Sequence, residues 1–291
     1  IIGLILGAYL LSMIRGEHQS KGGSSPIIRF ILGFFVMIGA LMFLGCPIRM
    51  ILRLGGGDLN ALFGIAGFAG GIGFGTIFLK KGYSLQRTYA LSKLESAMMP
   101  AIQVGLLVLV VTAPAFIFFS QKGPGAMHAP WLISLAAGLV VGGLSQVSRL
   151  CTVGGFRDLF LFKKSILIFG YLAVLIGVFV VNISFGNFHL GFENQPIAHT
   201  DGLWNFLGMA LAGFCSVLLG GCPLRQLIMT GEGNSDSAVT VLGLAAGAAF
   251  AHNFGLAASG AGPTLNGEIA VGVGFVVALI IAILNTKRAN A

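Results

Sequence analysis

The chain has 291 residues, of which 56% are hydrophobic and only 9% are charged, and its mean hydropathy is +0.94. Because soluble domains contain about 25% charged residues, this composition excludes an ordinary soluble globular protein. The formal net charge of +8 would suggest a nucleic-acid partner in a soluble protein. In this chain we interpret it mainly as a topology signal and expect no nucleic acid.

Uncharged apolar runs recur along the whole chain. Runs of about 18 residues or more are long enough to cross a bilayer as helices. The first run, residues 1–14, is shorter, and it lacks the basic region and cleavage site of a signal peptide. We interpret it as the tail of a spanning helix. The sequence thus predicts an all-α polytopic membrane protein with eight further runs, at residues 27–45, 59–79, 98–120, 130–147, 164–184, 203–221, 238–258 and 266–285.

Basic residues are divided unevenly between alternate linkers. Fourteen of them fall on one side of the expected topology and three, Arg49, Arg53 and Lys122, on the other. The positive-inside rule assigns the richer side to the cytoplasm, together with the C-terminus. The fourteen are Arg15, Lys21, Arg29, Lys80, Lys81, Arg87, Lys93, Arg149, Arg157, Lys163, Lys164, Arg225, Lys287 and Arg288.

The motif Gly-Cys-Pro-apolar-Arg occurs twice, at Cys46 and at Cys222, with an offset of 176 residues. Gly67 and Gly243 occupy the next runs at the same offset. Self-similarity over so long a period indicates a duplicated half rather than a solenoid. Five predicted spans separate the motifs, and an odd number inverts the second copy. We therefore expect an inverted repeat of two five-helix halves, residues 1–129 and 130–291, a plan common in transporters.

Each Cys-Pro motif opens a short segment, residues 46–54 and 222–230, that ends at glycines. Both segments are too short to span, and we expect re-entrant half-helices that meet at a central waist. A third short segment, residues 148–164, carries Cys151. At an offset of 176 its partner would precede residue 1, so we expect the N-terminal part of the first half to be absent from this sequence.

The cysteines of the repeated motif are suited to contact an anion. Proline is tolerated at the first position of a helix, which places Cys46 and Cys222 at or near the helix N-cap. Free amides and the helix dipole there favour negative charge and stabilise a thiolate. The preceding residues, Gly45 and Gly221, let a ligand or another backbone approach closely.

Several polar residues are further candidates for binding an anion. Arg49 and Arg225 follow the two cysteines by three residues, on roughly the same helix face. Arg157 is either a ligand or the ion-pair partner of the adjacent Asp158, and we favour the ion pair slightly. His252 and Asn253 lie inside the predicted run 238–258, where polar side chains are candidate functional groups, although a packed histidine is about equally compatible with the sequence.

The remaining cysteines are interpreted by their context. Cys215 lies in the middle of a run without a repeat partner, so we expect a packing residue. Cys151 has charged neighbours and a short segment, which favours a functional role. We expect no structural disulfide, since the cysteines enter from different faces. No Cys-x-x-Cys or His-x-x-x-His spacing occurs, so no metal site is predicted, and no cofactor.

Five long motifs are similar to the YeeE/YedE family of sulfur-transport membrane proteins, specifically to the branch of YedE-type selenium transporters. This resemblance implies an inverted-repeat channel or carrier of the bacterial inner membrane. It also implies that Cys46, Cys151 and Cys222 relay the anion by transient S–H hydrogen bonds. Composition and spacing do not separate selenium from sulfur. The motifs occupy residues 39–62, 148–162, 191–213, 220–236 and 249–257.

Two functions follow from these residues. The first is uptake of a small selenium- or sulfur-containing anion, thiosulfate-like in charge, through a cysteine-lined waist, without enzymatic activity. Its partners would be the anion, the lipid bilayer and, as a further candidate, a cytoplasmic sulfur or selenium carrier protein. The alternative is a membrane thiol enzyme for disulfide exchange or sulfur transfer, with Cys46 or Cys222 as the nucleophile. The missing Cys-x-x-Cys motif favours the transporter.

Overall fold

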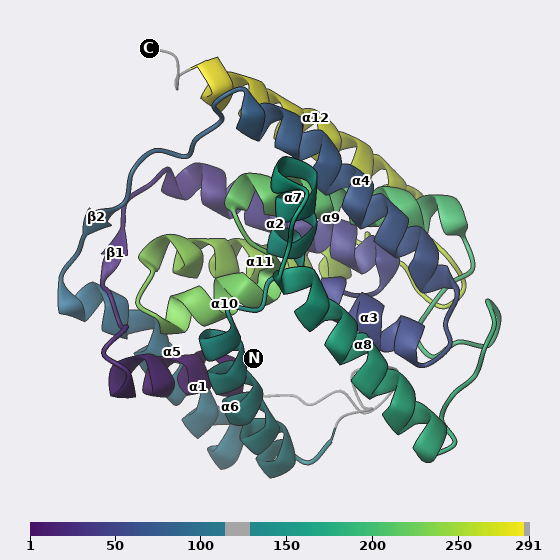
Figure 1. The fold of residues 1–291 in the computed structure, drawn as a ribbon, viewed down its shortest axis with the longest axis horizontal. Helices are drawn as coiled ribbons and strands as arrows, with labels where there is room; N and C mark the ends of the chain where they lie inside the picture. Colours follow the sequence, from purple (N-terminus) through teal and green to yellow (C-terminus); the bar gives the residue numbers. More distant parts are fainter. Residues whose placement is uncertain (114–128, 288–291) are drawn as a thin grey trace. The chain divides into compact units, whose positions relative to one another are not determined.

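The computed structural model describes residues 1–113 and 129–287, which form twelve α-helices and one pair of short strands (Figure 1). Seven helical segments of this part of the chain are long and apolar enough to cross a membrane. The prediction of an all-α polytopic membrane protein is therefore confirmed. The elements are α1 Ile2–Ile14, β1 Lys21–Gly22, α2 Pro26–Phe43, α3 Pro47–Gly55, α4 Asn60–Lys80, β2 Tyr89–Ala90, α5 Lys93–Thr112, α6 Trp131–Ser148, α7 Thr152–Phe162, α8 Leu167–Ser184, α9 Gly202–Leu219, α10 Pro223–Gly231, α11 Ser235–Asn253 and α12 Leu265–Lys287.

Two predicted runs differ from the helices observed. The run predicted at 238–258 forms α11, which is not among the seven spanning segments and ends at Asn253. Gly255 takes a positive φ of 65°, a conformation that ends a helix and that glycine adopts without strain. The run predicted at 98–120 begins earlier, at Lys93, because Ser92 caps the helix by accepting from the Glu95 amide. Residues 114–120 of that run, and Lys122 and Arg288 of the charge count, lie outside the described residues.

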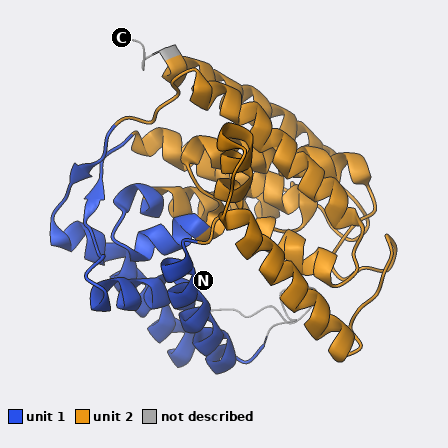
Figure 2. Cartoon of the chain, in the orientation of Figure 1, with its two compact units in different colours: residues 1–24, 87–149, 225–238 blue, residues 25–86, 150–224, 239–291 orange. Residues whose placement is uncertain are grey.

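The chain divides into two compact units (Figure 2). Unit 1 comprises residues 1–24, 87–149 and 225–238, and unit 2 comprises residues 25–86, 150–224 and 239–291. Each unit takes segments from both sides of the predicted boundary between residues 129 and 130. The units are therefore not the two halves of the expected repeat, and the boundary stays a prediction.

Unit 1 is held together by close helix packing and by a small sheet. Helix α1 packs along α6, and a Cβ at Gly7 would collide with the Leu139 carbonyl. Small residues let the backbones of apolar helices approach in this way. Strands β1 and β2 pair antiparallel, and the Asp236 carboxylate accepts from the Gly23 and Ser24 amides at 2.8 and 3.0 Å. These bonds fix the segment that follows α1.

Unit 2 is built around α9, in which every residue from Gly208 to Leu219 is buried. Helices α2 and α4 both pack along it. A Cβ at Gly67 would collide with the Phe206 carbonyl, and a Cβ at Gly243 would collide with the Phe30 carbonyl. Both members of the second contact are related to the first by the offset of 176 residues. The same relation holds for the contacts of Gly71 with Ala210 and of Gly247 with Phe34.

The local backbone around the two Cys-Pro motifs also repeats at this offset. The residues before the motifs, Leu44 and Gly220, both take the left-handed conformation. The short helices α3 and α10 begin at the prolines, as predicted, and each ends one residue before a further matching pair of hydrogen-bonded turns. These turns are closed by the amides of Asp58 and Asn234, which donate to the carbonyls of Arg53 and Met229, both at 3.0 Å. These contacts are what a duplication requires, and the inversion of the halves stays a prediction.

Candidate functional site

Three of the four cysteines stand at the start of a short helix. Cys46 is the N-cap residue of α3 and Cys151 that of α7, and both have extended backbones. Cys222 directly precedes Pro223, the first residue of α10. The Cys151 sulfur accepts from the Gly154 amide at 3.3 Å. The sequence folds in this way because the proline, or the Gly-Gly pair of α7, starts a helix directly after the cysteine.

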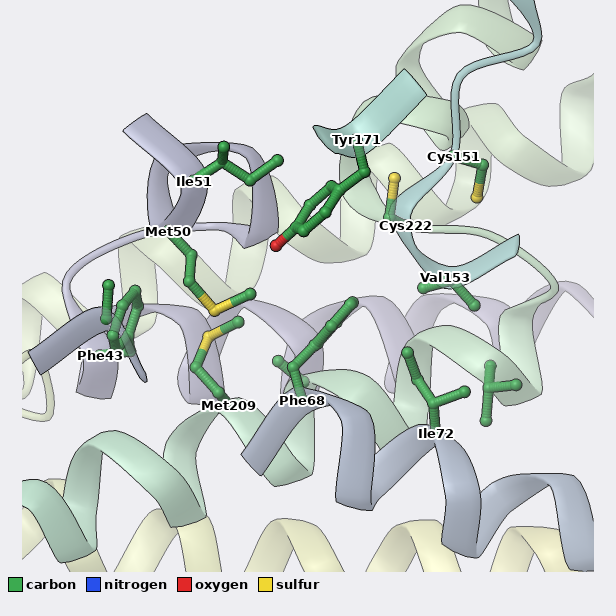
Figure 3. Close-up of a cluster of buried hydrophobic side chains, with 13 residues drawn as sticks. Phe43, Met50, Ile51, Phe68, Ile72, Cys151, Val153, Tyr171, Met209 and Cys222 are labelled. Carbon is green, nitrogen blue, oxygen red and sulfur yellow. The ribbon is translucent and has the colours of Figure 1, made fainter. Parts of the chain in front are cut away.

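The structure brings these three cysteines together within unit 2. The Cys151 and Cys222 side chains are hydrogen-bonded to each other, and Cys46 lies close enough to Cys222 for an electrostatic interaction. Cys151 and Cys222 are buried, with 6% and 1% of their surface exposed, whereas Cys46 is partly exposed. Figure 3 shows the two sulfurs side by side at the edge of a buried apolar cluster. Segments far apart in the sequence therefore meet as one sulfur-lined site.

Tyr171 of α8 completes this cysteine cluster, although no feature of its sequence context predicted it. Its ring lies near both Cys222 and Cys46 and packs edge-on against Phe156 at 5.9 Å between centroids. Its hydroxyl is buried and has no hydrogen-bond partner among the described residues. A buried unsatisfied donor is costly, so this hydroxyl is a ready contact for an anion or a water molecule.

The contact between Cys151 and Cys222 predicts a specific crosslink. In a Cys46→Ala/Cys215→Ala background, copper–phenanthroline should oxidise the remaining pair to a disulfide, because neighbouring thiols need little backbone movement to bond. Peptide mapping by mass spectrometry before and after reduction would identify it. A Cys46→Ala/Cys222→Ala variant is the matched control and should stay reduced, since Cys215 lies inside α9. A crosslink in the control, or none in the first variant, would contradict the arrangement.

A cavity of about 510 Å³ in unit 2 lies beside α3 and is called the Arg49 cavity here. Arg49 packs its aliphatic part over Gly45, where a Cβ would approach the arginine Cδ to 2.7 Å. Its Nε is buried without a hydrogen-bond partner, and no carboxylate of the described residues pairs with it. The walls are otherwise rich in side-chain amides. They comprise Leu52, Arg53, Gly56, Asp58, Asn182, Asn187, His189, Asn194, Gln195 and Pro196.

Arg53, in contrast, is held in a buried network. Its Nε donates to Asp58 at 2.6 Å and its Nη1 to the Phe43 carbonyl at 2.5 Å, and its guanidinium lies 4.0 Å from the centroid of the Phe43 ring. Asp58 also accepts from the amide and side chain of Asn60, both at 2.9 Å. Backbone bonds from His189 and Gly191 to Gly56 and Gly57 tie the loop after α8 to this turn. That loop, predicted as a lid or a plain surface loop, forms a fixed wall of the Arg49 cavity.

The other predicted site residues lie elsewhere. Arg157 pairs with Asp158 at 2.8 Å, as favoured from the sequence. His252 and Asn253 are exposed in the last turn of α11 and outside the cysteine cluster. The prediction that they lie inside a span is wrong, because the helix ends there. Cys215 is fully buried in α9, as expected of a packing residue.

Arg225 and Gly221 flank Cys222 differently from their counterparts. Arg225 forms a bidentate ion pair with Glu232, with both bonds at 3.1 Å. The turn containing Glu232 was interpreted only as the end of the half-helix, so this pair was missed. Gly221 donates its amide to the Ser216 carbonyl at 3.1 Å. All four cysteines are free, and no cluster of ligands in the described residues could hold a metal ion.

Comparison with protein families adds an independent finding. Residues 147–286 match the family model described as sulphur transport. This part of the chain belongs to the sulphur-transport family. The matched segment contains Cys151, Tyr171 and Cys222, and therefore most of the cysteine cluster. No curated protein matches the chain. With its spanning helices, the protein is a multi-pass membrane protein with a sulphur-transport segment.

Proposed function

We propose that this protein carries a small sulfur- or selenium-containing anion across the membrane through the cysteine cluster. The observation that carries the proposal is the meeting of Cys46, Cys151 and Cys222 beside Tyr171 in unit 2. Thiols donate weak hydrogen bonds, so they hold an anion briefly and release it to the next thiol. The selenium branch rests on the resemblance, and the two elements share this chemistry.

The helix termini reduce the cost of moving an anion through an apolar environment. An unpaired ion in a low-dielectric medium is strongly disfavoured. At the cluster, the starts of α3, α7 and α10 follow the three cysteines, and the positive ends of helix dipoles favour negative charge. Arg49, without an ion-pair partner among the described residues, supplies a full positive charge beside the first of them. The matching contacts at an offset of 176 residues support our proposal of an inverted repeat.

Location and partners follow the same proposal. We place the protein in the bacterial inner membrane with a cytoplasmic C-terminus, on the charge distribution of the linkers. Transport is passive and is drawn by consumption of the anion in the cytoplasm, where a sulfur or selenium carrier protein receives it. The chain itself performs no enzymatic step.

Uptake into proteoliposomes tests this function. Wild-type protein should take up thiosulfate or selenite, and Arg49→Gln should raise the KM about tenfold, because a charge-assisted hydrogen bond contributes about 1.5 to 3 kcal/mol. Arg157→Gln is the matched control, since Arg157 is already paired with Asp158, and its KM should stay within about twofold. Equal effects of the two variants would remove Arg49 from the pathway.

A membrane thiol enzyme is the second candidate, and one observation favours it. The Cys151 and Cys222 thiols are in direct contact, as in a dithiol that exchanges with a disulfide. If wild-type protein moves neither anion but accumulates a Cys151–Cys222 disulfide or a persulfide during turnover, this candidate replaces the transporter.

A further inference from the structure

The two copies of the motif differ in one charged position. Ten residues after the cysteine, the first copy has Gly56 and the second has Glu232. The arginine three residues after the cysteine is present in both. The second copy therefore carries a carboxylate that the first lacks, within reach of its own arginine.

The Glu232 carboxylate occupies the guanidinium of Arg225. Both carboxylate oxygens accept from Arg225, each at 3.1 Å, and the two side chains are only 14% and 12% exposed. This fork-to-fork geometry is the one in which arginine binds carboxylates and other oxyanions. Arg49 has no such partner among the described residues. One arginine of the repeated pair is open and the other is filled by an internal anion.

The surroundings of Glu232 hold more positive than negative charge. A cavity of about 320 Å³ within unit 1, called the Glu232 cavity here, is lined by Lys21, Arg149 and Arg225 and by the carboxylates Glu17 and Glu232. Arg149 bridges the two acids, at 2.6 Å to Glu232 and 2.7 Å to Glu17. Lys21 forms no ion pair with a described residue. The cavity thus contains one cation more than its acids neutralise.

Glu17 is fixed to the network from the other side. It accepts from the buried Gln146 side chain at 2.6 Å. This hydrogen bond, followed by that from Arg15, lowers the pKa of Glu17, so the carboxylate is ionised at neutral pH. Glu17 therefore neutralises Arg149 without contacting Arg225, which leaves Glu232 as the carboxylate that controls Arg225.

We propose that the Glu232 cavity is a second anion site, in which the Glu232 carboxylate occupies the place on Arg225 that the transported anion takes. This inference rests on the proposed transport function. Arg225 follows Cys222 by three residues on the same short helix, so an anion released by Cys222 meets it next. Glu232 competes for Arg225 and shortens the stay of the anion, which promotes release. The ligand class is a small oxyanion such as thiosulfate or selenite.

Anion affinity and release rate test the second site together. Binding of radiolabelled thiosulfate to purified protein and its uptake into proteoliposomes would be measured for Glu232→Gln. Glutamine keeps the size of the side chain and removes the competing charge. We expect roughly tenfold tighter binding and a lower maximal uptake rate, because a charge-assisted bond to Arg225 becomes free for the anion. Arg225→Gln in the same chain should cancel the gain.

Two variants keep the test specific. Glu17→Gln removes the other carboxylate of the network but not the partner of Arg225, and its thiosulfate affinity should stay within about twofold of wild type. Glu232→Asp retains a competing charge and should bind as wild type does, even if Glu232→Gln does not fold. Unchanged affinity in Glu232→Gln, or tighter binding in Glu232→Asp, overturns the second site while uptake by wild type upholds transport. Absence of binding and uptake in wild type overturns both.

Discussion

Uptake should fall by about ten- to a hundredfold when Cys46, Cys151 or Cys222 is replaced singly by alanine, and Cys215→Ala should retain it. Each of the three thiols contributes a hydrogen bond to a charged ligand, and such a bond contributes about 1.5 to 3 kcal/mol, which corresponds to this range of rates. Initial rates of thiosulfate and selenite uptake into proteoliposomes provide the measurement. The melting temperature of each variant in detergent would be recorded beside them.

Position rather than chemistry distinguishes the four cysteines in this experiment. Cys215 is as buried as Cys222, with 0% and 1% of their surface exposed, so the packing effect of removing sulfur is similar at both sites. Cys215 lies within α9, however, whereas the other three precede helix N-termini. A general loss of stability would therefore impair Cys215→Ala and Cys222→Ala alike. Such a shared loss, or full uptake by all three variants of the cluster, would exclude the relay.

Cys→Ser variants separate hydrogen bonding from sulfur chemistry. A hydroxyl donates a stronger hydrogen bond than a thiol but is not a comparable nucleophile. If the cysteines only relay an anion, Cys222→Ser should retain more uptake than Cys222→Ala. If a covalent sulfur intermediate is required, both variants should fail equally.

The helices and the positions of the cysteines were predictable from local sequence. Apolar runs fix where a helix can cross a bilayer, and Cys-Pro pairs fix where α3 and α10 begin. The run 238–258 was misread because hydropathy does not register the backbone break at Gly255. Helix α11 therefore ends earlier, and His252 and Asn253 lie in its last turn rather than inside a span.

The partners of the polar side chains were not predictable in the same way. Glu232 and Arg149 are 83 residues apart, and their ion pair exists only because unit 1 folds them together. Tyr171 looks like any aromatic residue in an apolar run, and its neighbours Cys46 and Cys222 come from other segments. The sequence indicates which residue types are available for an anion site. Their occupancy, such as an open Arg49 and a filled Arg225, depends on tertiary contacts.

The largest effect on stability is expected from Asp58→Asn. Arg53 and Asp58 form an ion pair at 2.6 Å with side chains only 5% and 4% exposed. Removing one partner of a buried pair leaves an uncompensated charge and typically costs about 3 to 5 kcal/mol. The free energy of unfolding in mixed micelles should fall by that amount. Asp158→Asn is the matched control: its pair with Arg157 is 25 to 32% exposed, and its loss should cost about 0 to 1 kcal/mol.

The double variant Arg53→Met/Asp58→Asn distinguishes the cost of a stranded charge from the contribution of the pair itself. Methionine fills much of the arginine volume without a charge, so most of the stability lost in Asp58→Asn should return. Asn60, which donates two bonds to Asp58, keeps an acceptor in the asparagine side-chain oxygen. If the double variant is as unstable as Asp58→Asn, the network itself holds α3 to the turn that follows. The Arg49 cavity should then lose its wall, and thiosulfate affinity should fall with stability.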